Sequence, residues 1–457
     1  MIKTNPFFTN PYNDAFGNGD ALTPQRPLEP VKKLPALEMS RFKNLSPTSV
    51  GNGILDLQDS GAFVFNEAVE GAKLRASGKG YSLFEKNVNT VEMYGLSPDA
   101  FNQSLVKGNV QMVRQSGENS GTNSLDVLGD LENSLQSGTN AENEVIARRV
   151  GQAIMNGEGG TTNRLTATDV DRLALAGSDT TEGKGTRNDA FVTSTVKELL
   201  TALHQGKSSG VFNVVGRWED SAVGATTELL VEEMAQAYLE GQSNKNRVLV
   251  NKGVKEFAIG KAAEGNDNRI TAHEGIERFG ILGKNNTNQV FSFSGLKASE
   301  AVLQGAGNET KYFGNGQQTV RIGGNKNKSI IETSDLISQT FASAQERQRF
   351  VEQQKDTLQL GGTGNEVRAN LGVGNDAIYV HANAHSQNSQ YEVMGGEGQD
   401  SMTLEGQKQD WFSQKNKDGS TTFTHKRLNQ AVTVKSIEKI CYSPQIKTSE
   451  IGFRPTA

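Results

Sequence analysis

Oxygen-bearing side chains in the segment DLQDSGAFVFNE, residues 56–67, have the spacing of a loop that wraps a hard divalent cation. Oxygen ligands alternate at its start, and a carboxylate closes it. Gly61 stands where such a loop makes its sharp turn. We therefore predict a Ca²⁺ site here, with Ala62 acting through its backbone carbonyl. The five predicted ligands are Asp56, Gln58, Ser60, Ala62 and Glu67.

The loop resembles an EF-hand, which implies a helix on each side of it. Only Asp56 and Glu67 would bring charge to ligand positions, so the resemblance implies the weak affinity of extracellular calcium modules. The preceding segment holds Pro47 and Gly51 and is a poor helix. The alternative is a plain turn capped by Asp56 in front of a helix.

Apolar residues between about 49 and 285 recur at helical spacing, which predicts short amphipathic helices. The predicted faces are Ile146/Val150/Ala153/Ile154, Val196/Leu199/Leu200/Leu203 and Leu230/Met234/Ala237/Tyr238. Similar polar turns recur at 116–131, 156–173 and 263–279, each followed by one large apolar residue. These repeats resemble degenerate EF-hand-like or dockerin-like units, most of them without the ligands. The apolar residues after the turns are Phe63, Leu125, Leu165, Phe191, Phe212 and Ile270.

From residue 286 the pattern changes to short β-type runs separated by glycine turns, with a helical insert near 335–354. Gly305, Gly314 and Gly323 recur at intervals of nine residues. This resembles the RTX (hemolysin-type) nonapeptide, which implies a parallel β-roll that binds Ca²⁺ through turn carboxylates. Asp376 and Asp400 occupy the aspartate position of that pattern. Other turns place there Glu309, Gln318, Lys328 and Glu366, which leaves few stacked carboxylates.

The segment 411–443 has the cadence of the strands that close many secreted RTX proteins, with a hairpin turn at Asp418 and Gly419. The resemblance implies export by a type I-like route with an uncleaved C-terminal signal. We therefore expect a secreted or cell-surface protein, with a cytoplasmic location as the alternative.

The composition excludes several classes of function. A net charge of −5 argues against a general binder of nucleic acid or anionic membrane. One cysteine cannot form a disulfide framework, and no apolar run is long enough to span a bilayer. No hydrolase or phosphate-binding motif is present. His381 and His385 lie in a predicted strand and turn, where they would not share a helical face.

Together these patterns predict an α+β multidomain chain. Residues 1–48, rich in proline, form a disordered arm, 49–285 a helical region of degenerate EF-hand-like repeats, and 286–457 a glycine-rich parallel β-roll or β-solenoid. The predicted function is non-enzymatic calcium binding with a structural or adhesive role at the cell surface. Its partners would be calcium and a second surface protein or a glycan. The alternatives are a metal-free surface scaffold and a secreted hydrolase whose site is hidden in the helical region.

Overall fold

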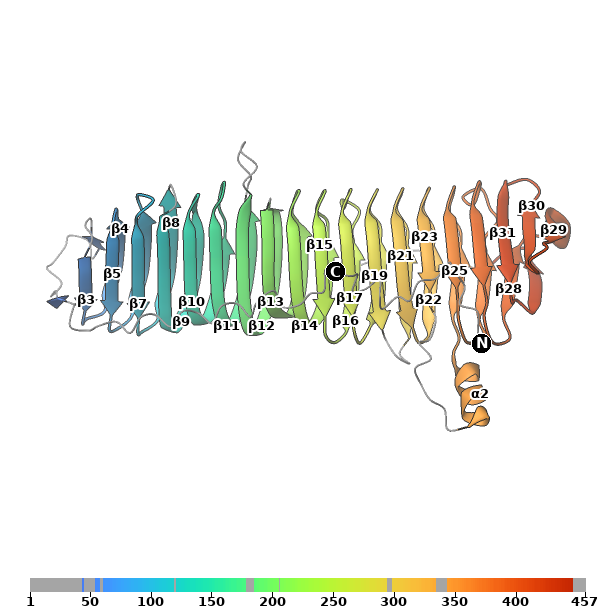
Figure 1. Cartoon of the computed structure of the whole chain (residues 1–457), viewed down its shortest axis with the longest axis horizontal. Helices are drawn as coiled ribbons and strands as arrows, with labels where there is room; N and C mark the ends of the chain where they lie inside the picture. Colours follow the sequence, from blue (N-terminus) through green and yellow to red (C-terminus); the bar gives the residue numbers. More distant parts are fainter. Residues whose placement is uncertain are drawn as a thin grey trace.

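A computed structural model describes residues 43–44, 54–57, 61–118, 121–177, 185–204, 206–293, 298–333 and 343–446. The predicted arm, residues 1–48, lies outside the described residues apart from the two-residue strand β1. Within the described ranges the chain winds into one elongated parallel β-solenoid (Figure 1).

The strands become long in the first half of the solenoid and short again in the second half. The first strands are β1 (Lys43–Asn44), β2 (Ile54–Leu57), β3 (Gly61–Phe65), β4 (Val69–Ala76), β5 (Lys79–Phe84), β6 (Val88–Gly95), β7 (Phe101–Val106) and β8 (Val110–Glu118). The long strands are β9 (Thr122–Thr139), β10 (Glu142–Met155), β11 (Thr162–Gly177), β12 (Thr186–His204), β13 (Gly206–Ser221) and β14 (Thr226–Leu239).

The second half of the solenoid returns to two strands in each coil. Its strands are β15 (Lys245–Val250), β16 (Val254–Ile259), β17 (Asp267–Ala272), β18 (Ile276–Ile281), β19 (Thr287–Phe293), β20 (Ser299–Leu303), β21 (Glu309–Asn315), β22 (Gln318–Ile322), β23 (Lys328–Glu332), β24 (Thr357–Leu360), β25 (Glu366–Asn370), β26 (Ala377–Val380), β27 (Gln390–Met394) and β28 (Ser401–Glu405). The C-terminal strands are β29 (Trp411–Lys415), β30 (Thr421–His425), β31 (Gln430–Lys435) and β32 (Lys439–Ser443).

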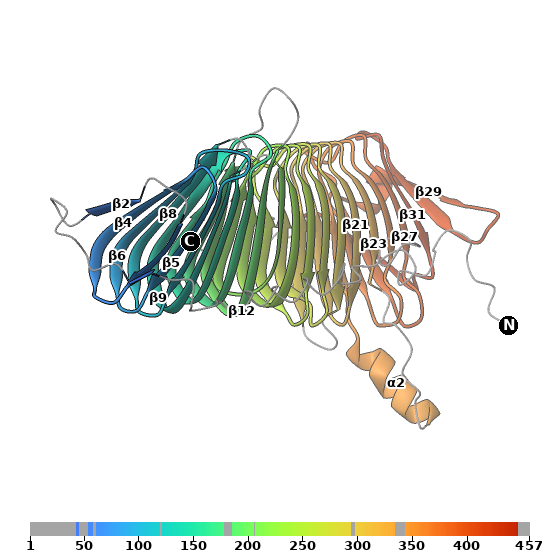
Figure 2. The ribbon, with the colours of Figure 1, turned by 60° about the vertical axis from the view of Figure 1, so that its left-hand side comes forward.

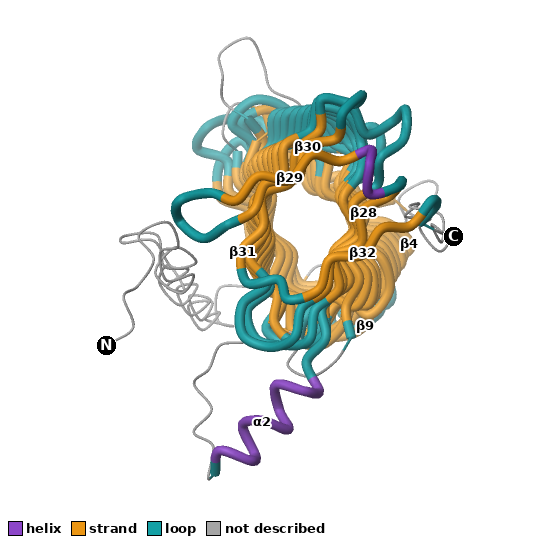
Figure 3. The backbone as a smooth tube through the Cα atoms, turned by 90° about the vertical axis from the view of Figure 1, so that its right-hand side faces the viewer, coloured by secondary structure: helices purple, strands orange, loops and turns teal. Residues whose placement is uncertain are grey.

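Most short strands pair in parallel with the strand two places further along the chain, because two strands make one coil. At the C-terminal end β27 and β28 pair with β31 and β32, since the antiparallel pair β29–β30 lies between them in the sequence. A long strand such as β10 makes both sides of its coil and pairs directly with β9 and β11. Successive coils therefore lie in register, one strand spacing of about 4.8 Å apart. The stacked coils form a tube of strands around the interior, as Figures 2 and 3 show.

Side chains that point inward form continuous rows along the solenoid. Apolar and aromatic rows fill most of the interior; in one of them Phe257 lies between Trp218 and Phe279, with ring centroids 6.2 and 6.1 Å away. Two further rows are amides.

In the inner amide row, the Asn123 Nδ2 donates to Asn143 Oδ1 over 3.0 Å, and the same bond repeats in later coils. In the corner amide row, the backbone N–H of Asn266 donates to Asn286 Oδ1 over 3.0 Å, and this bond also repeats. These hydrogen bonds tie the buried amides to the next coil, which fixes the register between coils.

The predicted helical region is wrong. The described residues between 61 and 285 are strands, turns and bends, and the solenoid continues through residue 286. The apolar spacing misled because a strand that bends around a coil corner skips a residue. In β14 the buried apolar residues are Leu229, Val231, Met234, Ala237 and Leu239. Steps of two along the flat parts and of three at the corner imitate helical spacing.

The repeated polar turns mark coil corners and not helix starts. Leu125 and Leu165 point inward in one row, joined through Val145 of the intervening coil. The predicted helical insert corresponds to α2 (Ala344–Gln353), which projects from the side of the solenoid (Figure 2). The predicted hairpin is β29–β30, whose turn contains Gly419 at φ +86°.

Candidate functional site

The residues of the predicted calcium loop 56–67 do not lie between two helices. Asp56 is in β2, where its backbone lies opposite Lys73 of β4, and Ala62 is in β3, where its backbone lies opposite Tyr81 of β5. Glu67 is exposed and forms an ion pair with Lys86, with its Oε2 2.7 Å from Nζ. Gln58 and Ser60 lie outside the described residues. The EF-hand frame of the prediction is therefore wrong.

Asp376 and Asp400 do come together, at one corner of adjacent coils. The Asp376 backbone N–H donates to Asp400 Oδ1 over 2.9 Å, and the Asp356 N–H donates to Asp376 Oδ1 over 2.8 Å. At the far end, the Asp400 N–H donates to Glu438 Oε2 over 2.7 Å. We call Asp356, Asp376, Asp400 and Glu438 the carboxylate row.

The carboxylate row continues a ladder that begins with Gln318, whose backbone N–H donates to Asp356 Oδ1 over 2.7 Å. Glu309, Lys328 and Glu366, predicted at equivalent positions, instead pair with one another in an exposed row on another face. The nonapeptide pattern therefore assigned residues from two different corners of the coil to one equivalent position.

Each carboxylate of the row accepts a hydrogen bond from a backbone N–H, as the side-chain amides of the corner row do. Asp400 is 1% exposed and its Oδ2 has no hydrogen-bond partner. Burial, strengthened by the negative charge of Glu438, raises the pKa of Asp400 to about 6.

Calcium takes six to eight oxygen ligands. Among the described residues, no three His, Cys, Asp or Glu side chains are grouped closely enough to hold a metal ion. Calcium binding by Asp376 and Asp400 stays a prediction.

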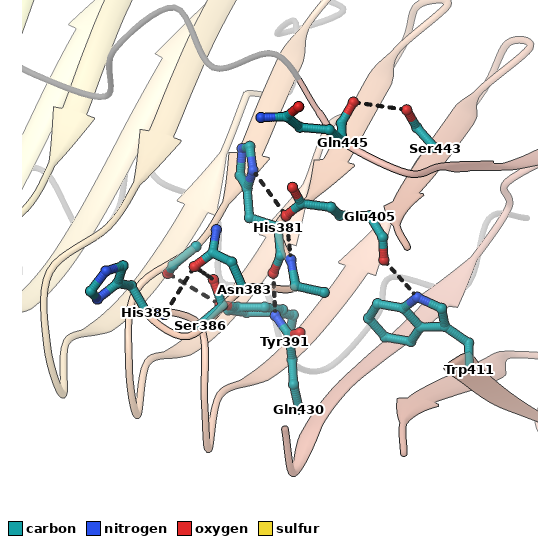
Figure 4. A network of polar contacts seen from close by, with 12 residues as sticks. His381, Asn383, His385, Ser386, Tyr391, Glu405, Trp411, Gln430, Ser443 and Gln445 are labelled. Carbon is teal, nitrogen blue, oxygen red and sulfur yellow. Dashed lines mark hydrogen bonds and ion pairs between the residues drawn. The ribbon is translucent and has the colours of Figure 1, made fainter. Parts of the chain in front are cut away.

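A second polar cluster lies near the C-terminal end of the solenoid (Figure 4). His381 is 2% exposed, and its Nδ1 lies 3.7 Å from Glu405 Oε2 in the next coil. Glu405 Oε2 also accepts the Ala382 N–H, and its backbone carbonyl accepts Trp411 Nε1–H over 2.9 Å. Gln430 donates to the His381 carbonyl over 2.8 Å.

This cluster links the last coils to the hairpin. Burial lowers the pKa of His381, and the nearby Glu405 opposes that shift only in part. His385, four residues along, is exposed, so the two histidines do not form a pair. The hydrogen bonds of the cluster hold the coils together.

A groove of about 480 Å³ lies across the coils that contain β6, β8, β9, β10 and β11. Buried Val88, Val110 and Leu131 form its floor. Two rows of polar side chains flank that floor. The lining side chains outside the floor are Asn87, Asn89, Asn109, Gln111, Asp130, Glu132, Arg149 and Asp171, together with Gly151.

One edge of the groove is an exposed amide ladder. The Asn109 N–H donates to Asn87 Oδ1 over 2.9 Å, and the Asp130 N–H donates to Asn109 Oδ1 over 2.9 Å. The other edge carries Asn89, Gln111 and Glu132, which occupy equivalent positions in successive coils. The groove thus presents the same kinds of polar group once per coil.

Gly151 opens the groove at the next position of that second edge. A β-carbon there would lie 2.6 Å from the Glu132 carbonyl oxygen, so the approach of the two backbones requires glycine. Arg149 and Asp171 also line the groove and form an ion pair with 3.1 Å between Nη2 and Oδ2.

Sequence reasoning missed Asp356 and the whole groove. Asp356 precedes the apolar strand TLQL as Asp376 and Asp400 precede theirs, and that signal could have found it. The groove residues come from five coils whose lengths differ, so no fixed spacing points to them.

No family model matches this chain, and neither a curated protein nor a solved structure gives a significant match. Among the described residues, no helix has the length and apolar character needed to cross a membrane. The function is therefore inferred from the fold and from the side chains on its surface.

Proposed function

We propose that this chain is a non-enzymatic scaffold of the cell surface or the extracellular space, which binds a partner along its side and holds its fold without a metal ion. This is the metal-free alternative of the sequence analysis. One observation carries the proposal: the buried amides of the corner row are satisfied from coil to coil by protein groups.

The corner amide row gives the clearest support. Asn308 is 2% exposed; its Oδ1 accepts the Asn286 N–H over 2.9 Å and its Nδ2 donates to the Gly283 carbonyl over 2.9 Å. Such a ladder performs the structural task that calcium performs in a roll of RTX type, because it ties each turn to the next. A rod built this way keeps a long lateral surface in fixed register.

Calcium titration tests the metal-free part of the proposal. We expect the midpoint of thermal unfolding to be equal in millimolar Ca²⁺ and in chelator, since only a ligand that prefers the folded state shifts it. A higher midpoint in Ca²⁺, abolished in the variant Asp376→Asn/Asp400→Asn, would instead establish the calcium-binding function. Asn keeps the Oδ1 acceptor at both positions and removes only the charge.

Labelling of intact cells tests the location. A membrane-impermeant amine reagent should modify exposed lysines such as Lys417 on whole cells of the organism that makes the protein. Modification only after lysis would refute a surface location and return the protein to the cytoplasmic alternative.

A further inference from the structure

We propose that the groove over β6–β11 binds a neutral, hydroxyl-rich polymer, that is, a glycan chain lying along the solenoid axis. The inference rests on the proposed function as a binding scaffold and names the partner. It is drawn from the length, the charges and the unused hydrogen-bonding groups of the groove.

The shape favours an extended ligand. The lining residues come from five successive coils, and at the spacing of parallel strands this is a length of about 19 Å. A volume of about 480 Å³ is in the range of ligand sites. Small-molecule pockets are mostly apolar, whereas here polar side chains surround a narrow apolar floor. A chain of hydroxyl groups with short apolar faces matches that surface.

The charges in the groove are largely neutralised already. Asp130 pairs with Arg148 over 2.7 Å, and Asp171 pairs with Arg149 and with Lys197, whose Nζ lies 2.7 Å away. Among the acidic residues that line the groove, only Glu132 has no ion pair in the described part of the chain. A cationic peptide would therefore gain little, and an anionic polymer would meet Glu132 directly.

The second edge supplies the hydrogen-bonding groups. Asn89, Gln111 and Glu132 are exposed and follow one another coil by coil. An amide offers two donors and an acceptor, and a carboxylate accepts two hydroxyl groups, so this edge can bond to successive hydroxyls of a sugar chain. Gly151 follows Glu132 on this edge and Asp171 follows Gly151, so no side chain stands between those two carboxylates.

Binding of defined hexamers to the full chain tests the proposal. The probes are fluorescein-labelled cellohexaose, maltohexaose and chitohexaose as neutral glycans, and hexalysine as the cationic competitor class, each followed by fluorescence polarisation. We expect at least one neutral hexasaccharide to bind, with an affinity that hardly changes between low and high salt.

The variant Gln111→Ala/Glu132→Ala should weaken that binding at least tenfold. The matched control is Glu366→Ala/Gln390→Ala, which removes the same two residue types from adjacent coils outside the groove. The control should bind as the unmodified protein does, and equal thermal midpoints should show that both variants are folded.

Three results would overturn the assignment: no binding by any neutral hexamer, binding by hexalysine alone, or equal loss in both variants. These results leave the scaffold proposal standing as long as calcium independence and surface labelling hold. Failure of those two experiments with intact glycan binding would refute the scaffold proposal and leave the groove assignment in place.

Discussion

Replacement of Asp220 by asparagine should stabilise the protein above neutral pH. Asp220, in β13, points into the interior of the solenoid and lies in an inward row between Thr201 and Leu239 of the adjoining coils. It is 1% exposed; its Oδ1 accepts the Ala222 N–H over 2.9 Å and its Oδ2 has no hydrogen-bond partner. Burial raises the pKa of this carboxyl from 3.8 to about 7.

The magnitude comes from proton linkage. Because the folded state holds the proton more tightly, its stability is greatest below the unfolded pKa and falls as the pH rises from about 4 to about 7. A shift of about three pKa units corresponds to about 4 kcal/mol of lost stability. Asparagine keeps the Oδ1 acceptor and carries no charge, so it should remove this loss. The variant should match the unmodified protein at pH 4 and exceed it by up to about 4 kcal/mol at pH 8.

The nearby Trp218 reports on this region. It is fully buried, its Nε1 donates to Thr201 Oγ1 over 2.9 Å, and Trp411 is the only other tryptophan of the chain. In a Trp411→Phe background, urea unfolding followed by Trp218 fluorescence at pH 4, 6 and 8 gives the local stability. Asp99→Asn, at an exposed carboxyl, is the control and should have no effect. The same pH dependence with and without Asp220 would refute the reasoning.

Three further predictions concern other buried polar groups. Asp400→Asn should remove a loss of about 3 kcal/mol between pH 4 and 6, since burial raises the pKa of Asp400 to about 6, and the thermal midpoint of the C-terminal coils at pH 8 should rise. His381→Gln should act in the opposite direction. Because the pKa of His381 is lowered in the folded state, the unmodified protein loses stability as the pH falls below the unfolded pKa of histidine. Between pH 8 and acid pH, the variant should therefore lose less stability than the unmodified protein. Asn286→Ala leaves the buried Asn266 N–H without its acceptor and removes one donor to the Ala263 carbonyl, which should lower the free energy of urea unfolding by about 1–3 kcal/mol. The control Gln390→Ala, on the surface, should change it by less than about 0.5 kcal/mol. Equal effects of Asn286→Ala and Gln390→Ala would contradict the role of the corner row.

Features that depend on neighbouring residues could be predicted from the sequence. Asp418-Gly419 between alternating runs predicted the β29–β30 hairpin, because glycine adopts the positive φ that the turn needs. The polar run 343–354, without β-branched clusters, predicted the helix α2. Glycine turns ahead of Asp376 and Asp400 predicted that these two residues occupy equivalent corners of adjacent coils.

The fold of the first half of the chain depends on contacts between coils and could not be predicted from the sequence. The step between the equivalent residues Asn143 and Asn163 is 20 residues, and between Asn163 and Asn188 it is 25, so no fixed repeat marks the coils. A bend at each corner shifts the inward alternation, and the sequence then imitates a helix. The strand conformation is stabilised by the neighbouring coil, which hydrogen-bonds to the buried asparagines and covers the apolar rows, and that coil is remote in sequence. The groove is built by five coils and forms only when they are stacked.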